Sequence, residues 1–198
     1  MIFKNGGNVM KELNPGIIKL IQKFEAGYKS RNQEILSDYM NSVFASNVEI
    51  TAIGTSAVSM DSDEWCIGYE AVSKLIADDW LYWGELKLDF TQMYSDQVND
   101  SAFVSICGTV YEKMTTDSYN KFRLSLVNDV IKRDDLDDKT KLIEILSGIS
   151  NTLMETNKGD DYFWPVRISG YLIKENENWK FKHIHFSYPI EFYPQVRK

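Results

Sequence analysis

The sequence predicts an α+β fold in which N-terminal helices are covered by a curved antiparallel sheet. Two amphipathic helical stretches lead the chain within residues 14–43, and long alternating runs follow in two pairs, each pair joined by a turn. Helices gathered at one end of an antiparallel sheet are typical of this class. A long, twisted sheet wrapped round a helix forms a cone with an open mouth, so we expect a cone-shaped domain.

The first two helices are indicated by a capping signal and by apolar spacing. Asn14 can cap the first helix, and Pro15 suits its first turn. Apolar residues then recur every three or four positions, which predicts one buried face. The first helix carries Ile17, Leu20, Ile21, Phe24 and Tyr28 on this face, and the second carries Ile35, Leu36, Tyr39, Met40 and Val43. Residues 1–13 lack such spacing and are expected to be a loose leader before a single domain at 14–198.

The middle of the chain predicts a short strand, a loop, a third helix and a hairpin. Residues 47–53 alternate and end at Gly54, and a small, polar and acidic stretch follows as a loop. Gly68 then precedes a helix that runs through Trp83. The alternating runs 85–95 and 102–113 are joined by a turn-like segment, which predicts the first long hairpin.

Residues 115–162 interrupt the alternating pattern and are interpreted as an insertion. Helical spacing of leucine and isoleucine predicts a helix over 138–155. The stretch 119–132 fits either a strand or a helix. Acidic residues outnumber basic ones, so one face is expected to be solvated. The insertion would cover or widen the domain, or form part of a subunit contact.

The last pair of alternating runs predicts a hairpin whose turn lies in the polar cluster 175–178. Strict alternation places five residues on one face of the final strand, and this face is aromatic with polar tips, as in many ligand pockets. These residues are Trp179, Phe181, His183, His185 and Ser187. A three-residue turn would place Arg167 and Ser169 on the same face, whereas a turn of two or four residues would place Ile168 and Gly170 there. We favour the three-residue turn.

Composition argues against several classes of partner. The formal net charge is −7 and no stripe of lysine or arginine is evident, so nucleic acid and an anionic membrane surface are not expected. No run reaches the length of a membrane span and no secretory leader is evident. Cys66 and Cys107 stand apart from each other, which favours a reducing compartment, and we expect a cytoplasmic protein.

No metal or cofactor is expected. His183 and His185 have a spacing that can chelate a metal, but they are the only two histidines and a third ligand is not evident. We therefore interpret both histidines as residues that line a cavity or are hydrogen-bonded in the structure. His185 is the best candidate for a general base, because a neutral imidazole suits proton transfer near neutral pH.

Two stretches resemble the nuclear transport factor 2-like superfamily, and within it the SnoaL-like branch. In the final hairpin the matching residues are Arg167, Ser169, Trp179, His185, Ser187 and Pro189, and upstream they are Gly54, Thr55, Glu64, Trp65, Gly68 and Glu70. The resemblance implies a cystatin-like fold with a pocket between the curved sheet and the first and third helices. It also implies a homodimer packed sheet to sheet. An isomerase's catalytic set has no match here, and the superfamily hosts many functions.

Our leading hypothesis is a protein that binds a small organic ligand in an aromatic cavity without strong catalysis. The expected ligand-binding residues are Trp65, Arg167, Trp179, Phe181, His183, His185 and Ser187. If Arg167 points into the cavity, the ligand carries an anionic group. One alternative is an enzyme of isomerase, cyclase or dehydratase type with His185 as base. Another is a dimeric assembly module that works through Ile184, Phe186 and Tyr188 on the outer face.

Overall fold

The computed structural model describes residues 13–57, 59–62, 64–113, 116–156 and 161–188. Of the predicted leader only Leu13 falls within these ranges, and Pro189 of the final motif also lies outside them. The chain divides into two compact units, which are described separately below. The sheet unit comprises Met1–Gly108 with Pro165–Lys198, and the hairpin unit comprises Thr109–Trp164.

The helices of the sheet unit begin where the sequence predicts. They are α1 (Pro15–Ser30), a short 3-10 turn (Gln33–Ile35), α2 (Leu36–Val43) and α3 (Tyr69–Tyr82). Asn14 Oδ1 accepts a hydrogen bond of 2.8 Å from the Gly16 amide, so the predicted cap of α1 is confirmed. The predicted apolar face of α1 is buried. Gly68 precedes α3, as expected from the sequence.

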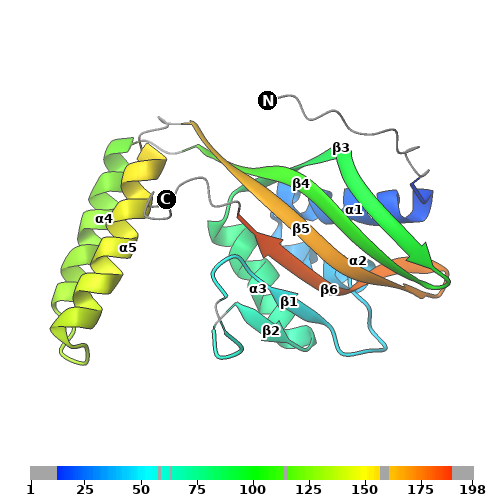
Figure 1. Cartoon of the computed structure of the whole chain (residues 1–198), viewed down its shortest axis with the longest axis horizontal. Helices are drawn as coiled ribbons and strands as arrows, with labels where there is room; N and C mark the ends of the chain where they lie inside the picture. Colours follow the sequence, from blue (N-terminus) through cyan, green and yellow to red (C-terminus); the bar gives the residue numbers. More distant parts are fainter. Residues whose placement is uncertain (1–12, 58, 63, 114–115, 157–160, 189–198) are drawn as a thin grey trace, which may run out of the picture. The chain divides into compact units, whose positions relative to one another are not determined.

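One open, mixed sheet of six strands runs through the described residues in the order β2, β1, β6, β5, β4, β3 (Figure 1). Its strands are β1 (Thr51–Ile53), β2 (Trp65–Ile67), β3 (Glu85–Val98), β4 (Ser101–Lys113), β5 (Asp161–Glu175) and β6 (Asn178–Ser187). The α+β class is confirmed, but two details differ from the prediction. β1 pairs with β6 in parallel, so the sheet is not purely antiparallel. β2 pairs with β1 in a stretch that the sequence suggested was the end of a loop.

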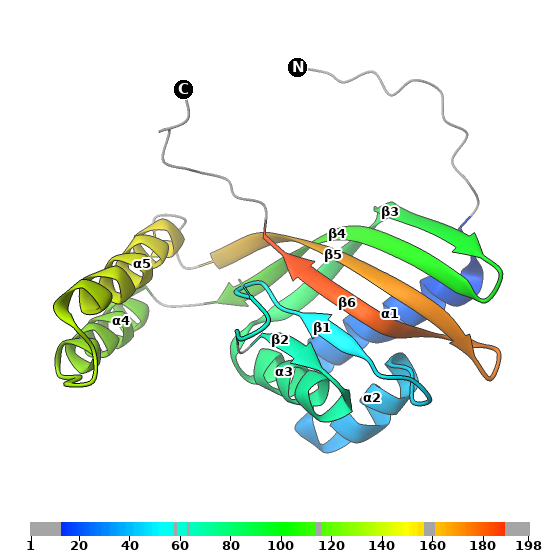
Figure 2. The same cartoon turned by 60° about the horizontal axis from the view of Figure 1, so that its bottom comes forward.

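Helices α1 and α2 pack on one face of this sheet, which Figure 2 shows from a second direction. The Phe24 ring of α1 lies 5.5 Å from Phe181 and 6.1 Å from Phe186, measured between ring centroids. All three side chains are buried. The core of the sheet unit is therefore an aromatic layer between α1 and β6, and burial of such rings is a large source of stability.

A β-bulge in β6 changes which residues face the helices. Tyr171 pairs with His183 but Leu172 pairs with Phe181, so Lys182 is an extra residue on β6. Successive residues of a strand point to opposite faces, and one extra residue reverses the alternation. Trp179 and Phe181 therefore face the helices before the bulge, while after the bulge this face is occupied by even-numbered residues, among them Ile184 and Phe186.

The prediction that five residues of β6, from Trp179 to Ser187, share one face is therefore wrong. Trp179 and Phe181 are buried beneath the helices, whereas His183, His185 and Ser187 lie on the opposite face of the sheet, called here the outer face. Local alternation could not reveal this, because the bulge is defined by the pairing with β5.

The register of the final hairpin agrees with the favoured arrangement, although the turn does not. Arg167 pairs with Ser187 and Ser169 pairs with His185, so these side chains share the outer face. The turn has two residues, Asn176 and Glu177, both with positive φ, as in a type I′ turn. A two-residue turn alone would place Ile168 and Gly170 on the face of His183 and His185. The extra residue at the bulge shifts the pairing by one position, so Arg167 and Ser169 lie on that face, as was expected from a three-residue turn.

The hairpin unit contains α4 (Thr116–Ile131) and α5 (Asp138–Thr156), so the ambiguous stretch 119–132 is helical. Asp137 Oδ1 accepts a 2.7 Å hydrogen bond from the Thr140 amide and thereby caps α5. Lys141 Nζ donates to the Ile131 carbonyl at 3.1 Å, which satisfies a free carbonyl at the end of α4. None of the helices that the structure describes has both the length and the hydropathy needed to cross a membrane.

Candidate functional site

A cleft of about 640 Å³ lies against α3 in the sheet unit, and we call it the α3 cleft. It is lined by Glu64, Cys66, Ala71, Lys74, Leu75, Asp78, Asp79, Tyr82 and Trp83. The α3 members recur at steps of three and four residues, so one face of this helix forms a wall. The remaining wall comes from β2 and from the residue that precedes it.

Asp79 connects the α3 cleft to the interior of the sheet unit. Tyr28 Oη, from α1, donates a hydrogen bond of 2.6 Å to Asp79 Oδ2. Burial raises the pKa of Asp79 to about 7, and the hydrogen bond from Tyr28 opposes this rise because it stabilises the carboxylate. Burial also raises the pKa of Tyr28, so its hydroxyl remains a donor at neutral pH. Asp79 can therefore hold or release a proton near pH 7.

Glu64 places a second carboxylate in the same cleft. Its Oε2 accepts a 2.7 Å hydrogen bond from the Ser56 amide, and its backbone carbonyl accepts one of 2.9 Å from the Gly54 amide. The Glu64 side chain lies directly over Gly54, where a Cβ would be 2.2 Å from Oε2. Glycine at 54 thus leaves room for this carboxylate. The negative charge of Glu64 contributes to the raised pKa of Asp79.

Aromatic side chains surround this acidic pair. The Trp83 ring lies 5.7 Å from Tyr28 and 5.5 Å from Phe186 between centroids, edge to face in both cases. Trp83 Nε1 donates a hydrogen bond to Tyr188 Oη, and burial raises the pKa of Tyr188. The cleft thus combines aromatic side chains with fixed polar groups, as small-molecule sites do.

Lys74 and Cys66 are two further ionisable groups in the lining of the cleft. Lys74 Nζ forms an ion pair of 2.6 Å with Asp78 Oδ2, one helical turn along α3. Burial raises the pKa of the Cys66 thiol, which disfavours the reactive thiolate. Across the described residues there is no cluster of three or more histidine, cysteine or acidic side chains that could hold a metal ion.

Four of the predicted ligand-binding residues lie on the outer face of the sheet. His183 Nδ1 and Thr51 Oγ1, of β1, form a 2.7 Å hydrogen bond, and burial lowers the pKa of His183. His185 pairs with Ile53 in the parallel register and Ser187 pairs with Arg167. Arg167 is exposed, and its Nη2 donates to the Tyr188 carbonyl at 3.3 Å. The structure brings these four together, away from the side that packs against the helices.

The other three predicted residues take part in packing. Trp179 and Phe181 are buried, and the Phe181 ring lies 5.9 Å from Phe44. Trp65 is half-buried in β2, between Glu64 and Cys66 of the cleft lining. None of the seven predicted residues is among those that line the α3 cleft.

The assembly-module alternative assigned its contact surface to Ile184, Phe186 and Tyr188 on the outer face, and the structure contradicts this placement. Ile184 and Phe186 are buried against the helices, where Phe186 contacts Phe24 and Tyr28. Tyr188 is half-buried beside Trp83. The cause is again the bulge at Lys182, which moves the even-numbered residues after it to the helix side.

Sequence reasoning missed Asp79 and Tyr28 as a pair. One signal was present, because Asp79 occupies a position of the apolar stripe that runs along α3 through Leu75, Ile76 and Trp80. An acidic residue in a buried stripe is uncommon unless it has a partner. The identity of that partner, 51 positions earlier in the chain, comes only from the packing of α1 against α3.

No protein-family model and no curated protein matches this chain. Solved structures do match. A nuclear transport factor 2-like protein from Streptomyces avermitilis, provisionally assigned as a dehydratase, has a TM-score of 0.55 at 8% identity and covers 88% of this chain and 95% of that one. A Caulobacter vibrioides protein with a cystatin-like fold has a TM-score of 0.51 at 9% identity, covering 89% of each chain.

A third structure, from Xanthomonas campestris, is named as a candidate calcium/calmodulin-dependent protein kinase II association domain. It has a TM-score of 0.52 at 10% identity and covers 97% of this chain and 99% of that one. At such low identity these likenesses show the fold alone. The fold is nuclear transport factor 2-like and cystatin-like, as the resemblance in the sequence implied.

Proposed function

We propose that this protein binds a small organic molecule in the α3 cleft and exchanges a proton with it through Asp79. The observation that carries the proposal is the 2.6 Å hydrogen bond from Tyr28 to Asp79 in the wall of a cleft of about 640 Å³. Burial raises the pKa of Asp79 to about 7. Perturbed carboxyl groups in clefts are good candidates for functional sites.

The chemistry follows from the protonation state of Asp79. A carboxyl group with a pKa near the working pH accepts a proton when ionised and returns it when protonated. Tyr28 fixes the orientation of this group, and Glu64 disfavours its ionised form. Two reactions need such a carboxyl group. One is removal of a proton from the carbon beside a carbonyl, and the other is proton transfer during the loss of water. The role of general base thus moves from His185 to Asp79.

The charge of the cleft favours an uncharged or positively charged ligand. Glu64, Asp78 and Asp79 line it, and the one lysine in the lining is paired with Asp78 at 2.6 Å. An anion would meet these carboxylates at close range. The expectation of an anionic ligand depended on Arg167, which lies exposed and donates to the Tyr188 carbonyl.

Membership of the SnoaL-like branch is part of the proposal. The branch signature residues Gly54 and Glu64 lie in direct contact beside the cleft, which gives them a role in shaping it. The provisional dehydratase assignment of the Streptomyces avermitilis structure supports the same class of chemistry. Loss of water from a hydroxyl compound requires the removal and return of protons.

We also propose a homodimer and a cytoplasmic location. Phe103 and Tyr171 are exposed aromatic residues on β4 and β5, and Tyr171 lies on the outer face of the sheet beside His183. Exposed aromatic residues of this kind are enriched in subunit contacts. The association-domain description of the Xanthomonas campestris structure supports self-assembly. Within the described residues neither Cys66 nor Cys107 forms a disulfide bond, which supports a reducing compartment.

The test measures binding and proton exchange separately. Ligands are found by thermal-shift screening of small cyclic ketones and amines, and proton abstraction is followed by NMR as deuterium incorporation from heavy water. Asp79→Asn is expected to abolish exchange while some binding remains, since the amide cannot act as a base. His185→Gln is the matched control, because it removes an acid/base group on the outer face and is expected to leave exchange unchanged.

Two outcomes would contradict the proposal. If His185→Gln abolished exchange while Asp79→Asn kept it, the catalytic role would return to the outer face. The α3 cleft would not be the binding site if no probe bound to wild type. The same conclusion would follow if both substitutions weakened the affinity for the probes equally.

A further inference from the structure

Asp79 leaves one of its two carboxyl oxygens to a ligand of the α3 cleft. Its Oδ2 accepts the 2.6 Å hydrogen bond from Tyr28, and its Oδ1 has no hydrogen-bond partner among the described residues. Asp79 belongs to the lining of the cleft, so Oδ1 is the atom that remains for a ligand. An acceptor removed from bulk water costs free energy unless some donor reaches it. A hydrogen-bond donor on the ligand would supply what the chain does not.

Glu64 repeats this arrangement in the same lining. Its Oε2 accepts the 2.7 Å hydrogen bond from the Ser56 amide, and within the described part of the chain its Oε1 has no hydrogen-bond partner. The side chain packs closely on Gly54, which holds the carboxylate in place. The cleft therefore contains two carboxyl groups that are each oriented through one oxygen and can each accept a hydrogen bond on the other.

The lining supplies little positive charge to balance these groups. Among the described residues that line the cleft, Lys74 is the only cationic one, and it forms a 2.6 Å ion pair with Asp78. Burial raises the pKa of Asp79 to about 7, and the charge of Glu64 acts in the same direction. A cation bound beside Asp79 would favour its ionised form and so lower its pKa again.

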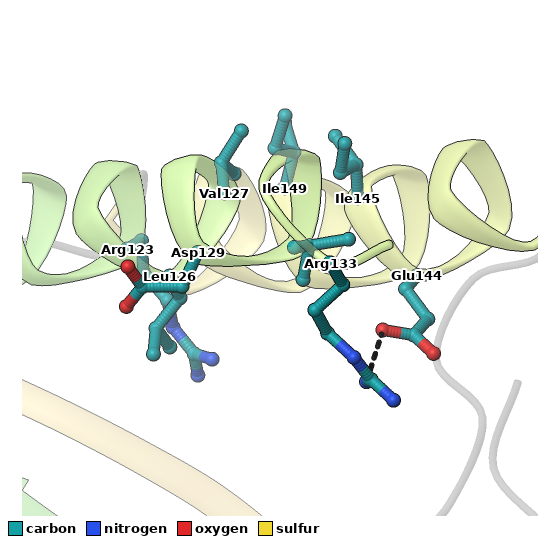
Figure 3. Close-up of a pocket in the computed structure, with 9 residues that line it drawn as sticks. Arg123, Leu126, Val127, Asp129, Arg133, Glu144, Ile145 and Ile149 are labelled. Carbon is teal, nitrogen blue, oxygen red and sulfur yellow. Dashed lines mark ion pairs between the residues drawn. The ribbon is translucent and has the colours of Figure 1, made fainter. Parts of the chain in front are cut away.

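The groove between α4 and α5 shows the contrasting case of charges that are already balanced. This groove, of about 350 Å³, lies in the hairpin unit (Figure 3). The guanidinium group of Arg133 in its lining pairs with Asp135 at 2.6 Å and with Glu144 at 3.7 Å. Its charged groups thus find partners within the chain, whereas the carboxyl oxygens of the α3 cleft leave a place for a ligand cation.

The rest of the lining suits an organic cation better than a metal ion. Trp83 and Tyr82 line the cleft, and aromatic rings attract cations that lie over their faces. Leu75 adds apolar surface, and a cleft of about 640 Å³ has room for a small organic molecule. Across the described residues no group of three or more histidine, cysteine or acidic side chains could hold a metal ion. The free acceptors call for N–H donors.

We propose that the ligand of the α3 cleft is an organic ammonium ion that donates N–H groups to Asp79 Oδ1 and Glu64 Oε1. Its apolar part lies against Trp83. Because Tyr28 already donates to Oδ2, the proton of a neutral Asp79 lies on Oδ1, and the ammonium group takes its place. The Oδ1–H bond breaks and the proton passes to solvent. This inference rests on the proposed function, since it names the ligand class of the same cleft.

Such a ligand would create the base that acts on it. A neutral Asp79 cannot accept a proton, and an ammonium ion beside it keeps it ionised at a pH where the empty cleft holds a proton. A neutral compound of the same shape would leave Asp79 partly protonated. Binding and proton release are therefore coupled, and this coupling can be measured without any reaction.

The other groups that act on Asp79 do not obscure this coupling. Burial raises the pKa of four hydroxyl and thiol groups, so they stay neutral below pH 8: Tyr28 of α1, Tyr39 of α2, Cys66 of β2 and Tyr188 after β6. On α3, Lys74 and Asp78 are paired with each other. Glu64 is tested by its own substitution.

Calorimetric titration of the full chain with three matched probes tests the proposal. Benzylammonium carries the charge and the N–H donors, benzyltrimethylammonium carries only the charge, and benzyl alcohol is neutral. Benzylammonium is expected to bind at least about ten-fold more tightly than the other two, since hydrogen bonds between charged groups are the strong ones. Two buffers of different ionisation enthalpy should report release of about half a proton at pH 7, because a group with a pKa of about 7 is then half protonated.

The affinity for benzylammonium should also depend on pH. Binding requires ionised Asp79, so the affinity is expected to level off above about pH 8 and to fall by up to about ten-fold per pH unit below 7. Asp79→Asn should remove the proton release and this dependence. Glu64→Gln should weaken benzylammonium several-fold and leave benzyl alcohol unchanged. Glu70→Gln is the matched control, because Glu70 is exposed on α3 outside the lining, and it should change neither affinity.

The outcomes separate this inference from the proposed function. Equal affinities for benzylammonium and benzyl alcohol, or binding without proton release, would overturn the inference. Deuterium exchange into a neutral ketone through Asp79 would then still support the proposed chemistry. Ammonium binding with proton release but without deuterium exchange in any bound amine would support the inference and reject the chemistry. Tight binding of benzyltrimethylammonium would overturn the N–H contacts, and no binding of any probe would overturn both proposals.

Discussion

Tyr28 Oη donates to Asp79 Oδ2 at 2.6 Å, and this bond joins α1 to α3 in the sheet unit. The hydroxyl comes from a stripe that otherwise packs as core, and the carboxylate opens onto a cleft. The same contact is therefore part of the packing of two helices and part of the candidate site. Changes at either residue should alter both stability and proton affinity.

Asp79 should make the stability of the protein depend on pH. Burial raises its pKa from 3.8 to about 7, so between these values the folded chain binds more protons than the unfolded chain. The contribution to stability is fully present below about pH 4 and is lost as pH rises through about 7. For Asp79→Asn this loss is absent. Relative to the variant, the free energy of unfolding of wild type should fall by at most about 4 kcal/mol over this range.

Urea denaturation at constant ionic strength measures this difference. The side chains that act most on the pKa of Asp79 are Tyr28, through its hydrogen bond, and Glu64 and Asp78, through their charge. Glu64→Gln is a useful companion, because it should lower the midpoint of the effect by removing a nearby negative charge. Parallel stability curves for wild type and Asp79→Asn would show that this carboxyl group has an ordinary pKa.

Tyr28→Phe should raise the pKa of Asp79 above its wild-type value. The hydrogen bond from Tyr28 stabilises the ionised carboxylate, and phenylalanine cannot donate it. The loss should also cost about 1 kcal/mol of stability, as expected for one buried hydrogen bond. Carbon-detected NMR titration of the Asp79 carboxyl group gives the pKa directly.

Tyr39→Phe is the control for this experiment. Its hydroxyl donates to the Phe24 carbonyl at 3.1 Å and not to Asp79, so the variant loses a comparable buried bond. Equal pKa values of Asp79 in both variants would mean that the 2.6 Å contact does not influence its ionisation.

Much of the fold could be predicted from local sequence signals. Asn14 and Pro15 marked the start of α1, and Gly68 marked the start of α3, because caps act through residues next to them. The face of His183 could not be predicted. It depends on Lys182 being an extra residue opposite Tyr171 and Leu172, and no pattern within β6 marks that choice.

The candidate site was harder still to predict. The sequence pointed to the outer-face cluster of Arg167, His183, His185 and Ser187, which proved to be neighbours but not cleft residues. In the sequence, Tyr28 and Asp79 each occupy a position in the buried stripe of a helix, and nothing local relates one to the other. Their contact depends on how α1 and α3 pack, and that is tertiary information.

Gly170→Ala should destabilise the sheet unit by about 1–3 kcal/mol, because it adds a methyl group to a full core. A Cβ at this position would lie 2.6 Å from Phe181 Cε1 and 3.0 Å from the His183 carbonyl oxygen. The Phe181 ring is fully buried and the carbonyl belongs to the bulged strand, so neither can move freely. Thermal unfolding measures the effect.

Ser169→Ala is the matched control for the glycine variant. It changes the adjacent residue on the outer face, where the side chain is only half-buried, and should alter stability by no more than about 0.5 kcal/mol. If alanine at 170 were tolerated as well as alanine at 169, the packing of Phe181 over Gly170 would not be tight.

Replacing residues 114–160 with a short glycine-rich turn should leave the sheet unit folded. β4 and β5 are neighbours in the sheet, so their ends are near enough to be joined directly. Among the described residues, every buried core side chain lies within Ile17–Val110 or Val166–Phe186. The variant should keep its cooperative thermal transition and any ligand binding. Loss of that transition would show that the sheet unit needs the hairpin unit to fold.

The parallel pairing of β1 with β6 also bears on how the protein is made. Thr51 pairs with His183, 132 positions later, and the Ser46 amide is held by the Glu175 carboxylate from the same distant hairpin. During synthesis, α1 leaves the ribosome long before β6 exists, so the part of α1 that packs against β6 stays uncovered until the chain is nearly complete. Contacts of such long sequence separation slow folding. Nascent chains that stop before β6 should consequently be strong clients of chaperones.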